Sequence, residues 1–492
     1  MKWSMLNKYL YDKISIAPLA MFRVLFGFMM LLSIIRFWYN GWIFDQYIYP
    51  DFYFTYYGFD WVKPLGSKGM YYTFYLMGFC ALAIMFGFFY RITSVLFFLT
   101  FTYVELIDKT NYLNHYYFVS LIGFLLIFLP AHRYFSIDVL IRPSIKLEKV
   151  SAWTINIIKF QLGLVYFYAG LAKLNYDWLV NALPLKIWLP AKTNVPLIGW
   201  LFNYKWSATL FSWGGALYDL TIPFLLLNKY TRPLAYLAVI GFHVMTAMLF
   251  QIGMFPYIMI LSTLIFFPAA FHQKIIDFLL NVIAKFIWLI QKLISNLSFQ
   301  KKTTINNDDF EINAGSASRT PSSGSTKSLI ASNQNQPNKF GGYGKIGKYA
   351  LITYIIFQLI FPFRSLLYPG NLYWTEQGYR FSWRVMLMEK AGYIVFHIYD
   401  PATGKIEQAN NYKYLTKTQE KQMSTQPDMI LQFAHFLKEK YKEKGFINPQ
   451  ITAESYVTLN GRRSKPFIDP KVNLVEMEEG WGHKTWVLPL EQ

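Results

Sequence analysis

The chain has 492 residues, of which 54% are hydrophobic and only 15% are charged. Soluble domains usually carry about 25% charged residues, so the composition argues against a soluble protein and favours a membrane protein. The net charge of +19 would suggest a nucleic-acid partner in a soluble protein. Here most Lys and Arg residues stand between apolar runs, where membrane topology and anionic lipid account for them. A single cysteine, Cys80, excludes an intramolecular disulfide and a cysteine-based metal site.

Nine apolar runs predict transmembrane helices and therefore a polytopic α-helical membrane protein. They cover residues 18–39, 70–90, 92–107, 116–131, 155–173, 206–227, 233–251, 254–270 and 346–363. A further stretch, 275–297, contains Lys285, Gln291 and Lys292, and we interpret it as an amphipathic helix at the membrane surface. The expected multi-span domain covers residues 1–300, and the last transmembrane helix covers residues 343–363.

Basic residues concentrate in alternate loops, which predicts the orientation of the chain in the membrane. With a cytoplasmic N-terminus, the inner loops hold Arg91, Arg133, Arg142, Lys146, Lys149, Lys229, Arg232 and the basic residues of 274–302. Nine spans then place the segment after the last helix outside the cytoplasm. We therefore expect a multi-pass integral membrane protein, of the cell inner membrane if the source is bacterial.

Two segments after residue 300 differ from the apolar runs. Residues 301–342 are rich in Ser, Asn, Thr and Gly and predict a disordered cytoplasmic linker. Residues 364–492 predict a strand-rich α+β domain outside the cytoplasm. Two strands surround a turn that contains Pro401 and Gly404, an amphipathic helix ends at Gly445, and Asn460-Gly461 marks a hairpin.

Polar residues from three predicted spans meet at one level beneath this C-terminal domain. Asn114 and His115 stand at the outer mouth of the fourth span, and Lys173 stands at the outer end of the fifth. His243 lies about two turns below the outer end of the seventh span, with Gln251 at its rim. Together they predict a polar pocket that faces outward.

Each of these residues also has a purely structural interpretation. A lysine at a span end most often extends to the headgroups, and a histidine at the interface is usually solvated. A histidine inside a span, such as His243, is as often a satisfied core residue as a site residue. No histidine spacing resembles a zinc site, and no phosphate-binding glycine loop is present. The residue pattern alone leaves the chemistry of the pocket open.

Five stretches resemble the vitamin K-dependent γ-glutamyl carboxylase family, including bacterial members with an HTTM-type membrane domain. They are IDKTNYLNH (107–115), VYFYAGLAKLNYDW (165–178), FHVMTAMLFQIGMF (242–255), and the tail motifs FIDPKVNL (467–474) and KTWVLPL (484–490). The motifs occur in the family's order and extend over most of the chain, with the linker as an interruption.

The resemblance implies a peptidyl-glutamate 4-carboxylase, which is a carbon–carbon lyase. Such enzymes oxidise vitamin K hydroquinone, a naphthoquinol, with O2 to the 2,3-epoxide. They use the energy to remove a γ-proton from a glutamyl residue and to add CO2. The implied co-substrates are the quinol, O2 and CO2, without a metal. The implied partners are the lipid bilayer and a glutamyl-containing peptide or protein of unknown identity, and no nucleic acid.

The resemblance also assigns roles to individual residues. The family's catalytic lysine falls on Lys173, which we expect to act as general base on the hydroquinone because a dry pocket disfavours its ammonium form. The family's motif histidine, which promotes carbanion formation or carboxylation, falls on His115. Asn114, His243 and Gln251 are expected to shape the quinone pocket.

The segment WTEQGYRFSWRVMLME (374–389) departs from the family at its glutamate-handling motif. Tyr379 and Trp383 align with the family's aromatic residues, but its histidine falls on Met388. Arg380 and Arg384 are expected to hold the substrate carboxylate instead, since a guanidinium binds carboxylates bidentately. The structural alternative is that these residues belong to an ordinary β-strand.

Two other functions fit the same sequence. The first is quinol epoxidation without protein carboxylation, with another acceptor or none. The second is a transporter or lipid-binding protein on the same scaffold, which internal repeats or broken helices would favour. Neither feature is evident in the sequence.

Overall fold

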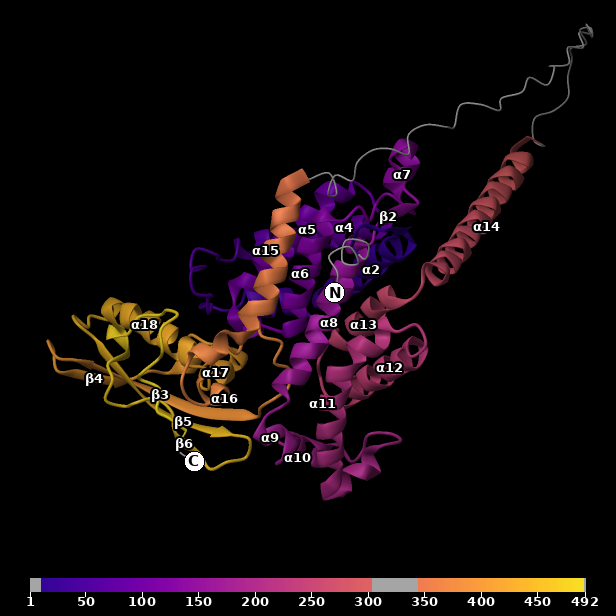
Figure 1. Ribbon diagram of the computed structural model, residues 1–492. Coiled ribbons are helices and arrows are strands. Elements are labelled where there is room, and N and C mark those ends of the chain that lie inside the picture. The colour runs from indigo at the N-terminus through magenta and orange to yellow at the C-terminus, as the bar shows by residue number, and fades with distance from the viewer. Residues whose placement is uncertain (1–9, 303–343, 491–492) are drawn as a thin grey trace, which may run out of the picture.

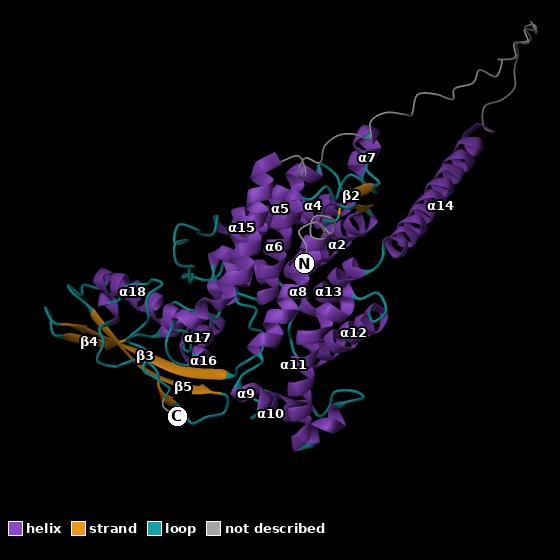
Figure 2. Ribbon diagram, in the orientation of Figure 1, coloured by secondary structure: helices purple, strands orange, loops and turns teal. Residues whose placement is uncertain are grey.

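The computed structural model describes residues 10–302 and 344–490 (Figure 1). Nearly all of the expected linker, 301–342, lies outside the described residues. The described chain forms a helical bundle and a smaller C-terminal domain that contains the longer strands (Figure 2).

All nine apolar runs are helical. Seven helices are long and apolar enough to cross a membrane, and an eighth span results if one bent pair is counted as a single span. The spans include α2 (Ala17–Tyr39), α4 (Gly66–Phe86), α5 (Tyr90–Ile107), α8 (Trp153–Ala172), α11 (Lys205–Leu227), α12 (Arg232–Leu249) and the helix at Tyr349–Leu367, which contains most of α15 (Gly344–Ile360). The fourth expected span, α6 (Asn114–Phe128), is shorter at 15 residues.

The bent pair consists of α13 (Phe255–Thr263) with its 3₁₀ extension, and α14 (Ala269–Lys302). The chain bends by 113° between the two helices. The stretch expected as a surface helix, 275–297, lies within α14, which points away from the bundle in Figure 1. Ile276 packs against Ala17 and Met21 of α2, whereas every side chain from 280 to 292 is exposed. Among the described side chains of α14, which end at residue 292, those at its start anchor the helix to the bundle.

Helix α2 is largely buried in the bundle and packs closely on α4. Gly27 makes this approach feasible, because a Cβ at this position would lie 2.5 Å from the backbone nitrogen of Met85. At the end of the bundle where α2 begins, strand β1 (Lys13–Ser15) pairs antiparallel with β2 (Lys149–Ser151). This pairing joins the N-terminal segment to the basic loop before α8, so both lie on one side of the bundle.

The C-terminal domain contains an antiparallel four-stranded sheet of order β4-β3-β5-β6. Its strands are β3 (Lys390–Asp400), β4 (Lys405–Gln408), β5 (Gln450–Leu459) and β6 (Lys465–Pro466). Helices α17 (Lys417–Met423) and α18 (Pro427–Glu443) lie beside the sheet, and the rings of Phe396 and Phe433 meet at 5.4 Å. The expected strand pair, amphipathic helix and hairpin are confirmed.

The remaining short helices connect these elements. They are α3 (Trp42–Tyr47), α7 (Ile137–Ile141), α9 (Tyr176–Leu179), α10 (Leu185–Trp188) and α16 (Leu372–Thr375). Helices α9 and α10 belong to the connection between α8 and α11, on the same side as the C-terminal domain (Figure 1).

Three polar contacts dock the C-terminal domain on the bundle. Lys109 pairs with Asp428 at 2.9 Å, and Arg462 pairs with Asp177 at 2.7 Å. The Asn114 amide donates to the Arg384 carbonyl at 2.9 Å. The domain therefore covers the end of the bundle at which α6 begins and α8 ends, which is where the sequence predicts the polar pocket.

Candidate active site

Lys173 follows the last residue of α8 and is buried, with a relative exposure of 6%. Its Nζ lies 2.7 Å from an Asp219 carboxylate oxygen and donates to the Ala169 carbonyl at 3.2 Å. The dry setting expected for this amine is present, and Asp219 of α11 adds a buried carboxylate that the sequence analysis did not include. The pair carries no net charge wherever its proton lies, so an apolar surrounding tolerates it better than a lone ammonium.

Close packing of α8 on α11 brings these two side chains together. A Cβ at Gly170 would lie 2.8 Å from the Leu220 backbone nitrogen, so a larger residue would force the two helices apart. Gly170 thus allows Lys173 to reach Asp219.

Lys173, Asp219 and His243 line one apolar cavity of about 100 Å³. The His243 Nε2 lies 3.0 Å from the Tyr166 hydroxyl, and its Nδ1 has no hydrogen-bond partner among the described residues. The rest of the wall is mostly apolar, and α9 and α10 contribute to it with Trp178, Leu185 and Trp188. An apolar ligand that carries one or two polar groups would therefore find an amine, a carboxylate and an imidazole nitrogen without a partner in this apolar cavity.

Most other expected site residues line a second cavity of about 500 Å³ beside the first. This polar cavity is lined by Asn114, His115, Gln251, Tyr379, Arg380 and Arg384, together with Arg36, Glu376 and Met388. The expected quinone pocket requires Asn114 and Gln251 to lie with His243 in the cavity of Lys173. The structure places them in the second cavity instead. They separate from His243 because α6 and the residues after α12 face the C-terminal domain.

A thin wall divides the two cavities. Ile252, Phe255, Val385 and Met386 line both of them. The Phe255 ring lies 5.6 Å from the His243 ring on one side and 5.8 Å from the His115 ring on the other. The two histidines expected at the site are thus neighbours across one aromatic side chain.

Arg380 and Arg384 both line the polar cavity but differ in their partners. Arg380 is paired with Asp428 at 2.7 Å and with the Gln426 side chain. The Arg384 guanidinium donates to the Ser365 hydroxyl at 3.2 Å, while its buried Nε has no partner among the described residues. Arg384 is therefore the better placed of the two for an incoming carboxylate.

Trp383 is a correction to the expected substrate site. Its side chain is fully buried, with 0% exposure, and stacks on Tyr117 at 4.9 Å without lining the polar cavity. The β-strand alternative for residues 374–389 is also wrong, because they form α16 and turns ahead of β3. Glu376, Phe381, Trp383 and Met386 have positive φ angles, and such residues cluster at ligand sites when the surrounding structure enforces them.

Sequence reasoning missed three residues that line these cavities: Asp219, Tyr166 and Arg36. An available signal was that Asp219 and Arg36 are charged residues within apolar runs, which mark functional sites in membrane proteins by default. Tyr166 had no comparable signal, since tyrosines are frequent in this chain.

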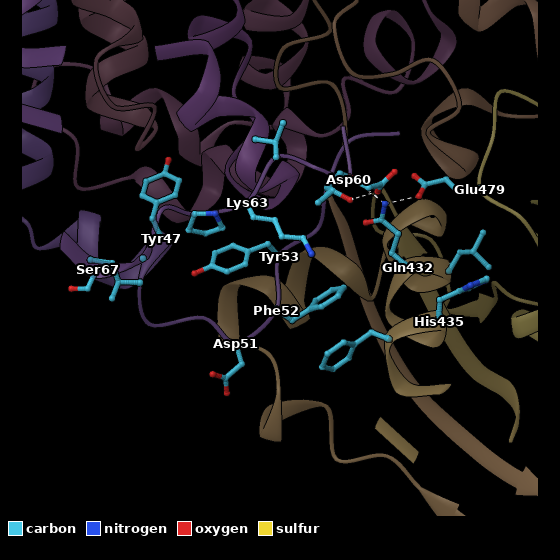
Figure 3. A pocket seen from close by; sticks show the side chains of 17 residues that line it. Tyr47, Asp51, Phe52, Tyr53, Asp60, Lys63, Ser67, Gln432, His435 and Glu479 are labelled. Carbon is cyan, nitrogen blue, oxygen red and sulfur yellow. Dashed lines mark hydrogen bonds between the residues drawn. The ribbon is translucent and has the colours of Figure 1, made fainter. Parts of the chain in front are cut away.

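A larger cavity, about 770 Å³, lies elsewhere, between the segment after α3 and helix α18 (Figure 3). Several of its polar groups already have partners, since Thr55 donates to Asp60 at 2.6 Å and Gln432 donates to Glu479 at 2.5 Å. None of the expected site residues lines this cavity. Size alone therefore does not identify the active site.

Comparisons with known protein families agree with this architecture. The HTTM domain family matches residues 11–271, more than half of the chain, and the vitamin K-dependent gamma-carboxylase lumenal domain matches residues 343–492. No solved structure matches the chain. The first match covers the helices that carry Lys173, Asp219 and His243, and the second covers the segment with Arg384. The chain belongs to the vitamin K-dependent γ-glutamyl carboxylase family.

Proposed function

We propose that the protein oxidises vitamin K hydroquinone with O2 to the 2,3-epoxide and couples this oxidation to γ-carboxylation of glutamyl residues. The observation that carries the proposal is the Lys173–Asp219 pair, buried at 2.7 Å in an apolar cavity within the membrane domain. A lipid-borne quinol matches this cavity in polarity, and the paired amine is available to its hydroxyl group.

Lys173 serves as the general base in this proposal. Its amine accepts a proton from the quinol hydroxyl when the proton shared with Asp219 lies on the carboxylate. Asp219 then faces the ammonium that forms and offsets the cost of charge in an apolar site. The unoccupied His243 Nδ1 offers a second hydrogen bond for orienting the quinol oxygen.

The polar cavity receives the glutamate. Arg384 holds its carboxylate, and His115 faces the same space from the start of α6. Because the two cavities share the wall at Phe255, the γ-carbon lies close to the oxidised quinol. The same wall limits the passage of water, which would otherwise protonate the strong base needed for this step.

We also propose an orientation for the chain, from the distribution of its basic residues. The basic loops lie on the side of the β1–β2 pair, and the positive-inside rule makes that side cytoplasmic. The C-terminal domain and the polar cavity then face away from the cytoplasm. In a bacterium, the protein would reside in the inner membrane.

Purified protein supplied with reduced vitamin K, O2, labelled CO2 and a glutamyl peptide tests the function. We expect both epoxide and peptide-bound label. Epoxide without label would favour quinol epoxidation alone, and the absence of quinol turnover would favour a transporter or lipid-binding protein.

A further inference from the structure

The polar cavity contains more positive charge than its own carboxylates neutralise. Four of its lining residues are cationic: Arg36, Lys109, Arg380 and Arg384. Lys109 and Arg380 both pair with Asp428, at 2.9 and 2.7 Å. The one acidic lining residue, Glu376, pairs with Lys390 at 2.8 Å. Within the described part of the chain, Arg36 and Arg384 have no carboxylate partner.

Arg36 is unusual because its guanidinium also has no hydrogen-bond partner among the described residues. It lies near the outer end of α2, 4.6 Å from the centroid of the Trp42 ring, and is half-buried. It lines the same cavity as His115. The guanidinium therefore presents free donors to the cavity beside the histidine.

The backbone leaves room for this guanidinium at Gly253. A Cβ at Gly253 would lie 3.2 Å from an Arg36 terminal nitrogen, and the φ angle of +62° at this position favours glycine. A glycine in the turn after α12 thus leaves space for the Arg36 guanidinium at the wall of the cavity.

We propose that Arg36 binds the carboxylate newly formed from CO2, while Arg384 holds the carboxylate that the glutamate brings. This inference rests on the proposed carboxylation. The polar cavity then fits a malonate-type side chain with two carboxylates, and its two unpaired guanidinium groups match the two negative charges of the product.

The chemistry of the step explains why a second cation is needed. The γ C–H bond breaks, and its proton goes to the base generated by oxidation of the quinol. The electron pair left on carbon forms the C–C bond to CO2, and one C=O electron pair of CO2 moves onto oxygen. The charge on the side chain changes from −1 to −2 without a further oxidant. A cation already placed where the second charge appears stabilises the transition state of this bond formation.

Binding of two peptides that differ only in one residue, glutamate or γ-carboxyglutamate, tests the inference without turnover. In Arg36→Gln, we expect affinity for the γ-carboxyglutamyl peptide to fall about tenfold or more, as for a lost hydrogen bond to a charged group. Affinity for the glutamyl peptide should change by less than about twofold, because that peptide lacks the second charge. Arg36→Lys keeps the charge and should show a smaller loss. Arg463→Gln removes an exposed arginine outside the cavity and serves as the matched control.

Equal losses for the two peptides, or no loss for the γ-carboxyglutamyl peptide, would overturn the role of Arg36. If Arg36→Gln fails to fold, the same comparison between Arg36→Lys and the wild type decides the question. Turnover separates this inference from the proposed function. A wild-type protein that forms no epoxide and fixes no CO2 contradicts the proposed function, whereas an active wild type with unchanged binding in Arg36→Gln contradicts only the second-carboxylate site.

Discussion

The two neighbouring cavities differ in the balance of charged side chains that line them. The apolar cavity encloses one amine and one carboxylate that neutralise each other, Lys173 and Asp219. The polar cavity holds two guanidinium groups, of Arg36 and Arg384, without carboxylate partners among the described residues. The first arrangement suits proton transfer with a neutral, lipid-soluble molecule, and the second suits an anionic side chain. The fold thus places two different environments on either side of Phe255, and each environment can be altered separately.

Among the substitutions considered for the two cavities, loss of the carboxylate in the apolar cavity should have the largest effect on activity. In Asp219→Asn, the ammonium that Lys173 forms on accepting the quinol proton has no carboxylate partner, and we expect epoxide formation to fall about a hundredfold or more, since proton transfer by a positioned group contributes about 10² to 10⁴. Asp177→Asn removes a carboxylate at the domain junction instead and is the matched control. Normal epoxide formation in Asp219→Asn would show that the pair has no role in catalysis.

Asp428→Asn should mainly affect how the C-terminal domain is held over the polar cavity. The change leaves Lys109 and Arg380 without their shared carboxylate, and we expect the free energy of unfolding to fall by about 3 kcal/mol. Thermal unfolding measures this loss. Unchanged stability would contradict the docking role of Asp428.

Acid should weaken the same contact. Burial by itself would raise the pKa of the Asp428 carboxyl, but Arg380 and Lys109 outweigh it and hold that pKa well below its usual range. A lowered carboxyl pKa stabilises the docked domain above about pH 4, and this contribution is lost as the pH falls further. The hydrogen-exchange protection factors of α18, which are corrected for the intrinsic pH dependence of amide exchange, should therefore fall on acidification, and less so in Asp428→Asn. A fall of these protection factors on alkalinisation instead would contradict this sign.

Phe255→Ala should blur the distinction between the two cavities. Phe255 is partly buried and packs against the core, so its removal should cost up to about 3 kcal/mol of stability, and it also opens the wall to water from the polar cavity. We expect the amount of CO2 fixed per epoxide formed to fall. Phe211→Ala, which alters another part of the apolar wall, should change this ratio less. Equal ratios in both variants would mean that Phe255 does not separate the cavities.

Met388→His should have the smallest effect, and it should raise the affinity of the polar cavity for a carboxylate. Met388 lines this cavity, and an imidazolium there adds a donor for the substrate carboxylate. We expect affinity for a glutamyl peptide to rise about fivefold. The gain should be present at about pH 6 and absent at about pH 8, because histidine loses its charge between them. A gain independent of pH would point to packing instead of charge.

Local patterns in the sequence were sufficient for the helices and strands, whereas the site depends on contacts between distant residues. Apolar runs predicted every helix that carries a site residue, and Asn460-Gly461 predicted the hairpin between β5 and β6. The burial of Lys173 did not follow from its place at the end of a run, which favours extension to the headgroups, and was expected only from the family resemblance. Asp219 was missed because its pairing arises from the packing of α8 on α11, which Gly170 permits.

The grouping of residues into two cavities was likewise not predictable from spacing. Asn114, Gln251 and His243 all approach the same end of the bundle, but Phe255 and Val385 come between them. Trp383 matched a family position in sequence and is nevertheless buried against Tyr117. An aligned aromatic residue therefore identifies a segment near the site, and only the fold determines which of its side chains face the cavity.

Epoxide formation by Lys173→Ala with reduced vitamin K and O2 tests most directly whether Lys173 is the base. We expect this variant to fold, because the uncharged alanine leaves Asp219 free to take up a proton, and to form essentially no epoxide. Epoxide formation near the wild-type rate would contradict the assignment of Lys173 as the base.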